Sequence, residues 1–128
     1  MDKKKVLIVD DEMYIRQLVN NALGRDYTVL EASDGEEAIY IIRTQKPDLI
    51  LMDVLMPNLD GYTACYEIKK DEATRAIPVV MLTGIGHELN KKLAQKMGAD
   101  GYITKPFNLQ DLLETVKRYE QATCLASA

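Results

Sequence analysis

The feature that most constrains the fold is a run of four apolar residues that ends in an acid, Leu-Ile-Leu-Met-Asp at 49–53. A continuous apolar run of this length is typical of a strand covered on both faces, as in a parallel sheet between two layers of helices. A carboxylate cannot lie unpaired inside such a layer. We therefore expect Asp53 at the carboxyl edge of the sheet, where ligands bind in open α/β folds.

The rest of the chain repeats this pattern of a short apolar run followed by an amphipathic segment. Five strands are predicted, at 6–9, 27–30, 49–53, 77–82 and 101–104. The intervening segments carry apolar residues at helical spacing, with predicted buried faces at Ile15, Leu18, Val19 and Ala22; Ala38, Ile41 and Ile42; Ala64, Cys65 and Ile68; Leu89, Leu93 and Met97; and Leu109, Leu112, Leu113 and Val116. Strands that alternate with helices predict an α/β fold, a doubly wound five-stranded parallel sheet with helices on both faces.

Several helix ends can be predicted from capping residues. Asp34, with Glu37 three residues later, is typical of a helix start, and Asn108 is expected to cap the last helix. Gly24 and Gly98 are expected to end helices as glycines at the position after the last turn do, in the left-handed conformation.

Composition limits the function classes that fit. The chain has 128 residues, of which 47% are hydrophobic and 28% charged, as in one ordinary globular domain. Its net charge of -4 disfavours direct binding of nucleic acid. The apolar runs are too short to insert into a membrane, and the basic start lacks the apolar stretch of a signal peptide. Cys65 and Cys124 lack metal-site spacing and fit free thiols, so a cytoplasmic location is expected.

Polar residues follow the strands where chemistry would need them. If the first strand lies mid-sheet, Asp10 and Asp11 at its end converge with Asp53. Three carboxylates in one pocket require a cation, and oxygen ligands in an open site favour Mg²⁺. One carboxylate could then form an aspartyl phosphate. Thr83 and Lys105, at the ends of the fourth and fifth strands, could supply a hydroxyl and an ammonium to the phosphoryl oxygens.

Each of these residues also has an ordinary structural role open to it. Asp11 or Glu12 could merely cap the first helix. Thr83 could be a loop residue and Asp53 a turn residue, and lysines such as Lys105 are mostly solvated. Their joint appearance at the carboxyl ends of four strands favours a shared site.

Four segments, in this order, resemble the response-regulator receiver domain: 5–12, 53–61, 78–84 and 98–107. The resemblance covers about residues 4–119 and is that of a stand-alone, chemotaxis-type receiver. It implies a flavodoxin-like (βα)5 three-layer sandwich with strand order 2-1-3-4-5, in a single domain over 1–128 with a short tail at 120–128. It also implies a signalling switch rather than an enzyme, one that assists its own phosphorylation and dephosphorylation.

The same resemblance implies roles for the acids. Asp53 would accept a phosphoryl group from the phosphohistidine of a sensor histidine kinase or a histidine phosphotransfer protein. Asp11 and Asp53, with the main-chain carbonyl of Leu55, would bind Mg²⁺, and Asp10 would act through water. The apolar residues Leu55 and Ile85 are expected to slow loss of the phosphoryl group.

The remaining roles concern the switch. Lys105 would pair with the phosphoryl group and Thr83 would turn its hydroxyl toward it, while Tyr102 would move from exposed to buried. The peptide bond between Lys105 and Pro106 is expected to be cis. A surface formed by the helix at 87–97, the strand at 101–104 and the helix at 109–119 would then bind a downstream protein target that the sequence does not name.

Alternative functions would require other residues at these positions. A receiver that never takes phosphate should lack at least one of the five site residues, and all five are present. Phosphatases of the haloacid dehalogenase class carry an acid two residues after the nucleophile, where this chain has Leu55, which cannot transfer protons. A flavodoxin-type carrier would need glycines and N–H donors after the first strand instead of acids. The chain could also be part of a longer regulator, although the tail at 120–128 is expected to be neither a helical linker nor Pro-rich, which mildly favours a free-standing protein.

Overall fold

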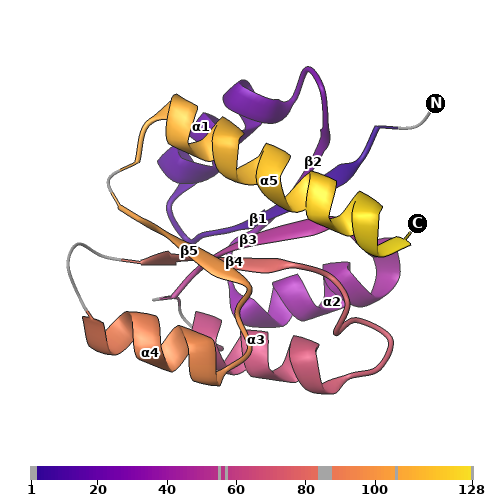
Figure 1. Ribbon diagram of the computed structural model, residues 1–128. Coiled ribbons are helices and arrows are strands. Elements are labelled where there is room, and N and C mark those ends of the chain that lie inside the picture. Colours follow the sequence, from indigo (N-terminus) through magenta and orange to yellow (C-terminus); the bar gives the residue numbers. More distant parts are fainter. Residues whose placement is uncertain (1–2, 55, 57, 84–87, 106, 128) are drawn as a thin grey trace.

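Five parallel strands form one sheet in the order β2-β1-β3-β4-β5 (Figure 1). Their bounds are β1 Lys5–Val9, β2 Thr28–Ala32, β3 Leu49–Asp53, β4 Val79–Thr83 and β5 Gly101–Thr104. The structure is a computed structural model that describes the chain except residues 1–2, 55, 57, 84–87, 106 and 128, and the side chains of 88–91 and 121–127. The predicted fold class and strand order are confirmed.

The helices cover both faces of the sheet in two layers (Figure 1). They are α1 Met13–Leu23, α2 Gly35–Gln45, α3 Gly61–Lys70, α4 Glu88–Lys96 and α5 Leu109–Ser127. Helices α1 and α5 pack on one face, against a core that includes Ile8, Leu51 and Leu82. Helices α2, α3 and α4 pack on the other, against Leu7, Ile50 and Met81. The three central strands β1, β3 and β4 are therefore buried on both sides, as their unbroken apolar runs predicted, whereas the edge strands β2 and β5 are partly exposed. None of the helices in the described part of the chain has the length and hydrophobicity of a membrane span.

The strand register brings the predicted site residues to one edge. Val9 of β1 pairs with Met52 of β3, so the residues that follow, Asp10 and Asp53, lie side by side where the two strands end. Asp53 pairs in turn with Leu82, one residue before the end of β4. Four strand ends thus open onto the same edge, which is the geometry the sequence predicted for a shared site.

Most of the predicted helix ends are observed. The Asp34 carboxylate accepts a hydrogen bond from Glu37 N at 2.8 Å, and Asn108 Oδ1 accepts one from Asp111 N at 2.8 Å. Gly98 has φ +93°, the left-handed conformation expected there. Gly24 does not: its φ is -60°, and its N–H donates to Asn20 O at 2.7 Å. A Cβ at this position would lie 2.6 Å from the same oxygen, so glycine is needed for close approach. Helix α1 does end at Gly24 as predicted, but without the left-handed conformation of a C′ glycine.

Two predictions about α5 are also wrong. The helix continues to Ser127, so the tail after residue 119 is helical. Residues 120–127 contain no glycine or proline and several good helix formers, which sustain the helix beyond its packed part. Leu109 was expected in the buried face but is 46% exposed, because it lies in the first turn; Leu112 and Val116 do form that face.

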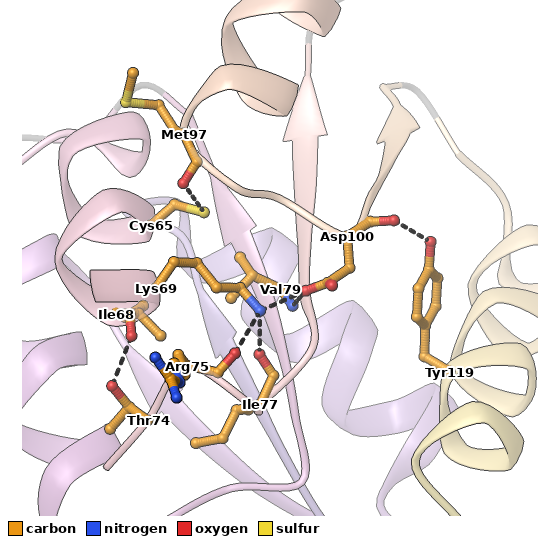
Figure 2. A network of polar contacts seen from close by, with 10 residues as sticks. All are labelled: Cys65, Ile68, Lys69, Thr74, Arg75, Ile77, Val79, Met97, Asp100 and Tyr119. Atoms are coloured by element: carbon orange, nitrogen blue, oxygen red, sulfur yellow. Dashed lines mark hydrogen bonds and ion pairs between the residues drawn. The ribbon is translucent and has the colours of Figure 1, made fainter. Parts of the chain in front are cut away.

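A polar network fixes the opposite, amino-terminal edge of the sheet (Figure 2). The Lys69 ammonium of α3 donates to Arg75 O at 3.1 Å, Ile77 O at 2.8 Å and Asp100 Oδ2 at 2.7 Å. Asp100 Oδ2 also accepts a hydrogen bond from the first residue of β4, at 2.8 Å. The Tyr119 hydroxyl of α5 donates to the main-chain oxygen of Asp100 at 2.9 Å. One lysine therefore joins α3, β4 and the loop before β5, and this edge is well fixed.

Cys65 behaves as a buried small hydrophobe. Its side chain has no exposed surface and lies in the α3 face with Ala64 and Ile68, as predicted. Burial raises the pKa of the Cys65 thiol to about 11, so it is an unreactive free thiol at neutral pH.

Candidate functional site

The site is built around Asp10, a carboxylate with no exposed surface that directly follows β1. Its two oxygens have different partners. Oδ1 accepts the main-chain N–H of Glu12 at 2.9 Å, and Oδ2 lies 2.9 Å from the ammonium of Lys105. A buried carboxylate is stable only when it is paired and hydrogen-bonded in this way.

Lys105 joins this acid to the end of β3. Its ammonium lies 3.5 Å from Asp53 Oδ1, and Asp53 is only 6% exposed. Partial burial by itself lowers the pKa of the Lys105 ammonium. The hydrogen bond with Asp10 and the charges of Asp53 and Asp10 outweigh that effect, so the pKa is raised above its usual value. One fixed cation therefore faces two carboxylates from neighbouring strands.

Thr83 supplies a hydroxyl at the end of the next strand. It is the last residue of β4 and is 1% exposed. Its main-chain oxygen accepts the N–H of Lys105 at 2.6 Å, so the end of β4 is bonded directly to the residue that carries the ammonium. Tyr102, the candidate switch aromatic in β5, is 42% exposed.

The acids after β1 form a cluster of possible metal ligands. Carboxylate oxygens of Asp10, Asp11 and Glu12 all lie within 4.8 Å of one another, and Asp11 and Glu12 are exposed. Glu12 is the N-cap residue of α1, but its side chain makes no capping hydrogen bond. The cluster consists entirely of oxygen donors, which fits a hard cation such as Mg²⁺. From the sequence, Glu12 was expected only as a possible helix cap; its place directly after two acids was the signal that it belongs to this group.

The chain returns to Asp53 at the start of α3. Gly61 N donates to Val54 O at 3.1 Å, and a Cβ on Gly61 would lie 2.1 Å from the main-chain oxygen of Asp53. Only glycine allows this approach. The Asp60 side chain then caps the helix by accepting Thr63 N at 2.9 Å. The helix start therefore holds the Asp53 main chain in place.

Other predicted features lie outside the described residues. They are the carbonyl and the apolar side chain of Leu55, the apolar side chain of Ile85, the bond between Lys105 and Pro106, and the thiol of Cys124. One residue beside the site was not predicted from the sequence. Arg16 of α1 donates to the main-chain oxygen of Asp10 at 2.7 Å. Its position one turn into the helix that follows the acids was the available signal.

The fold, with two acids and an ammonium at one edge of its sheet, points to a class of protein. Residues 6–117 match the response regulator receiver domain, and the chain belongs to that family. It is therefore a domain of the two-component regulators, whose receivers typically serve as signalling switches.

Individual relatives agree with this assignment. The chain is 44% identical over 115 residues to the alkaline phosphatase synthesis transcriptional regulatory protein PhoP of Bacillus subtilis, covering 89% of this chain and 47% of that protein. It is 44% identical over 115 residues to the phosphate regulon transcriptional regulatory protein PhoB of Pseudomonas aeruginosa, covering 89% and 50%. The chain thus spans about half the length of the curated relatives it matches.

A solved structure of similar length shows the same fold. The chemotaxis response regulator CheY4 of Vibrio cholerae superposes with a TM-score of 0.86 at 35% identity, covering 91% of this chain and 98% of that chain.

Proposed function

We propose that this domain is a phosphorylation-dependent switch in which Asp53 accepts a phosphoryl group. The donor is the phosphohistidine of a sensor histidine kinase or of a histidine phosphotransfer protein, in the cytoplasm. One observation carries the proposal: the Lys105 ammonium lies 2.9 Å from Asp10 and 3.5 Å from Asp53, at the edge where β1 and β3 end. A phosphoryl group on Asp53 would arrive beside a fixed positive charge.

The transfer step follows from these groups. An Asp53 carboxylate oxygen forms a bond to phosphorus while the P–N bond of the phosphohistidine breaks. The imidazole leaves with the electron pair of that bond and takes up a proton. Lys105 offsets charge on the phosphoryl oxygens, and the Thr83 hydroxyl donates a hydrogen bond to one of them. Hydrolysis reverses the modification: water attacks phosphorus, the P–O bond to Asp53 breaks, and inorganic phosphate leaves.

The acids beside Asp53 fit a divalent cation. Asp11 and Asp53, with the main-chain carbonyl of Leu55, would hold Mg²⁺, and Asp10 would act through a water ligand. All these donors are oxygen atoms. Lys105 is paired with Asp10 and Asp53, and Asp10 also lies in the close group of acids with Asp11 and Glu12. When bound, Mg²⁺ supplies positive charge to the phosphoryl oxygens and offsets the repulsion among the carboxylates.

Phosphorylation of Asp53 would change the surface that the domain presents to its partner. Charge on Asp53 would draw the Thr83 hydroxyl toward it, and Tyr102 would move from its exposed position into the space that opens. The α4-β5-α5 surface would then present a different face to a downstream protein. The receiver fold over about residues 4–119 would carry this switch as a single domain.

The proposal is tested with a small phosphodonor, acetyl phosphate, and intact-mass spectrometry. The wild type should gain one phosphoryl group when Mg²⁺ is present and none when it is chelated, and Asp53→Asn should gain none. Asp26→Asn serves as a matched control, because it removes an exposed acid from the loop before β2 and should be phosphorylated like the wild type. A wild type that takes no phosphate, or an Asp53→Asn protein phosphorylated at the wild-type rate, overturns the proposal.

A further inference from the structure

We infer that Arg16 is a positioning residue for the Mg²⁺-binding acids and that Glu31 holds Arg16 in place for this role. The inference rests on the proposed function, because it concerns the Mg²⁺ site of that proposal. Arg16 and Glu31 themselves would touch neither the metal nor the phosphoryl group. Arg16 lies in the first turns of α1 and Glu31 lies in β2, the strand on the far side of β1 from Asp53.

The contacts of Arg16 join three elements behind the site. One guanidinium nitrogen donates to the main-chain oxygen of Asp10 at 2.7 Å, and Nε lies 3.3 Å from Glu31 Oε1. The Asn20 amide, one turn further along α1, donates to the other Glu31 oxygen at 3.4 Å. The Arg16 side chain is 16% exposed although it is charged. A charged side chain that is largely covered and bonded at both sides of its fork has a fixed position.

The main-chain oxygen that Arg16 binds belongs to the peptide group between Asp10 and Asp11. The other groups of Asp10 are also held: its N–H donates to Ala32 O at 3.1 Å, and its carboxylate binds Lys105 and Glu12 N. Asp11 is exposed, and within the described residues no hydrogen bond holds its carboxylate. The orientation of the peptide between Asp10 and Asp11 therefore decides where the Asp11 oxygens lie, and Arg16 sets that orientation.

The charge of Arg16 and its position predict opposite effects on Mg²⁺ binding when the side chain is removed. As a cation near three acids, it disfavours a second cation at the site, so its removal should tighten Mg²⁺ binding if charge were its only effect. As the group that orients the peptide before Asp11, it favours the metal, so its removal should weaken binding. Residues that orient metal ligands typically contribute about 10- to 100-fold to affinity. The positional effect should exceed the charge effect, because Glu31 already offsets the charge at 3.3 Å.

The experiment measures the dissociation constant of Mg²⁺ for the unphosphorylated protein, by titration of amide chemical shifts. Arg16→Met should bind Mg²⁺ roughly tenfold more weakly than the wild type. Arg16→Lys should also be weaker, because an ammonium lacks the fork that reaches Asp10 and Glu31 together. Glu31→Ala should weaken binding, and Glu31→Gln should restore it, because an amide oxygen can still accept from Arg16.

Lys69→Met is the matched control. It removes a cation that likewise binds main-chain oxygens and one carboxylate, but at the opposite edge of the sheet. It should lower the free energy of unfolding and leave the Mg²⁺ dissociation constant unchanged. If Arg16→Met does not fold, the pair Glu31→Ala and Glu31→Gln decides the question.

Three results would overturn the inference: unchanged or tighter Mg²⁺ binding in Arg16→Met, equal binding by the two Glu31 variants, or a Lys69→Met effect as large as that of Arg16→Met. A wild type that binds no Mg²⁺ overturns it as well. Because the readout is metal binding, a wild type that binds Mg²⁺ but is never phosphorylated would refute the proposed function and leave this inference standing.

Discussion

Lys105 Nζ lies 2.9 Å from Oδ2 of Asp10, a carboxylate with no exposed surface, although the two residues are 95 positions apart in the chain. The pair connects the segment after β5 to the end of β1, across the width of β3 and β4. The same ammonium lies 3.5 Å from Asp53. The contact therefore serves stability and, under the proposed function, places a positive charge beside the phosphoacceptor.

Lys105→Met should lower the free energy of unfolding by about 3 kcal/mol, because it leaves the buried Asp10 carboxylate without its cation. Urea unfolding measures the change. Arg43→Met is the control, since Arg43 is exposed and lies 3.9 Å from Asp71; it should change stability by less than about 1 kcal/mol. Adding Asp10→Asn to Lys105→Met should recover part of the loss. Equal effects of the Lys105 and Arg43 variants would contradict the account.

Tyr62→Phe should raise the free energy of unfolding by about 1 kcal/mol. The Tyr62 hydroxyl oxygen is buried and, in the described part of the chain, has no hydrogen-bond partner. Removing it abolishes a desolvation cost while the ring keeps its packing. Tyr66→Phe, at a side chain that is 49% exposed, should change stability by less than about 0.5 kcal/mol. A loss of stability in Tyr62→Phe would show that the hydroxyl is satisfied in solution.

The free energy of unfolding should decrease between pH 10 and about 12, because Tyr27 then loses its proton in the unfolded state before it does so in the folded state. Burial, then the hydrogen bond to Glu120 and the negative charge of that residue, raise the Tyr27 pKa from 10.0 to about 12. The folded state therefore keeps this proton longer than the unfolded state does. Its contribution is fully present below pH 10 and is lost as the pH rises through about 12. Urea unfolding between these values should show a shallower decline for Tyr27→Phe than for the wild type, and parallel curves would refute this.

Leu55→Asn should shorten the lifetime of the phosphorylated protein. An apolar side chain beside Asp53 is expected to keep water from the acyl phosphate, whereas an amide could assist the attacking water. After removal of the phosphodonor, decay is followed by intact-mass spectrometry with Mg²⁺ present. Leu55→Met, which keeps an apolar side chain, should decay like the wild type. Decay of Leu55→Asn no faster than that of the wild type would contradict this expectation.

The fold and the site differ in how far local sequence determines them. Unbroken apolar runs predicted β1, β3 and β4, because strands buried on both faces need them, and the acids at 10 and 53 marked the sheet edge. Parallel topology then brought Lys105 to the same edge. The predictions for Gly98 and Asn108 were correct, because the roles of these two residues depend on neighbours within a few residues.

The three errors have different physical causes. Arg16 was missed because its role depends on Glu31, which is 15 residues away on another element. Gly24 was misjudged because close approach, not positive φ, requires glycine there. The end of α5 was placed too early because periodic apolar residues stop before the helix does, and helix propensity alone sustains the remainder.

The central claim is that Asp53 itself carries the phosphoryl group, and reductive trapping tests it most directly. Protein treated with acetyl phosphate and Mg²⁺ is reduced with borohydride, which converts an aspartyl phosphate to homoserine, and its peptides are sequenced by tandem mass spectrometry. The account predicts homoserine at position 53 and at no other aspartate, and only when both donor and Mg²⁺ were present. Homoserine at position 10 or 11, or phosphate retained on a hydroxyl such as that of Thr83, would contradict it.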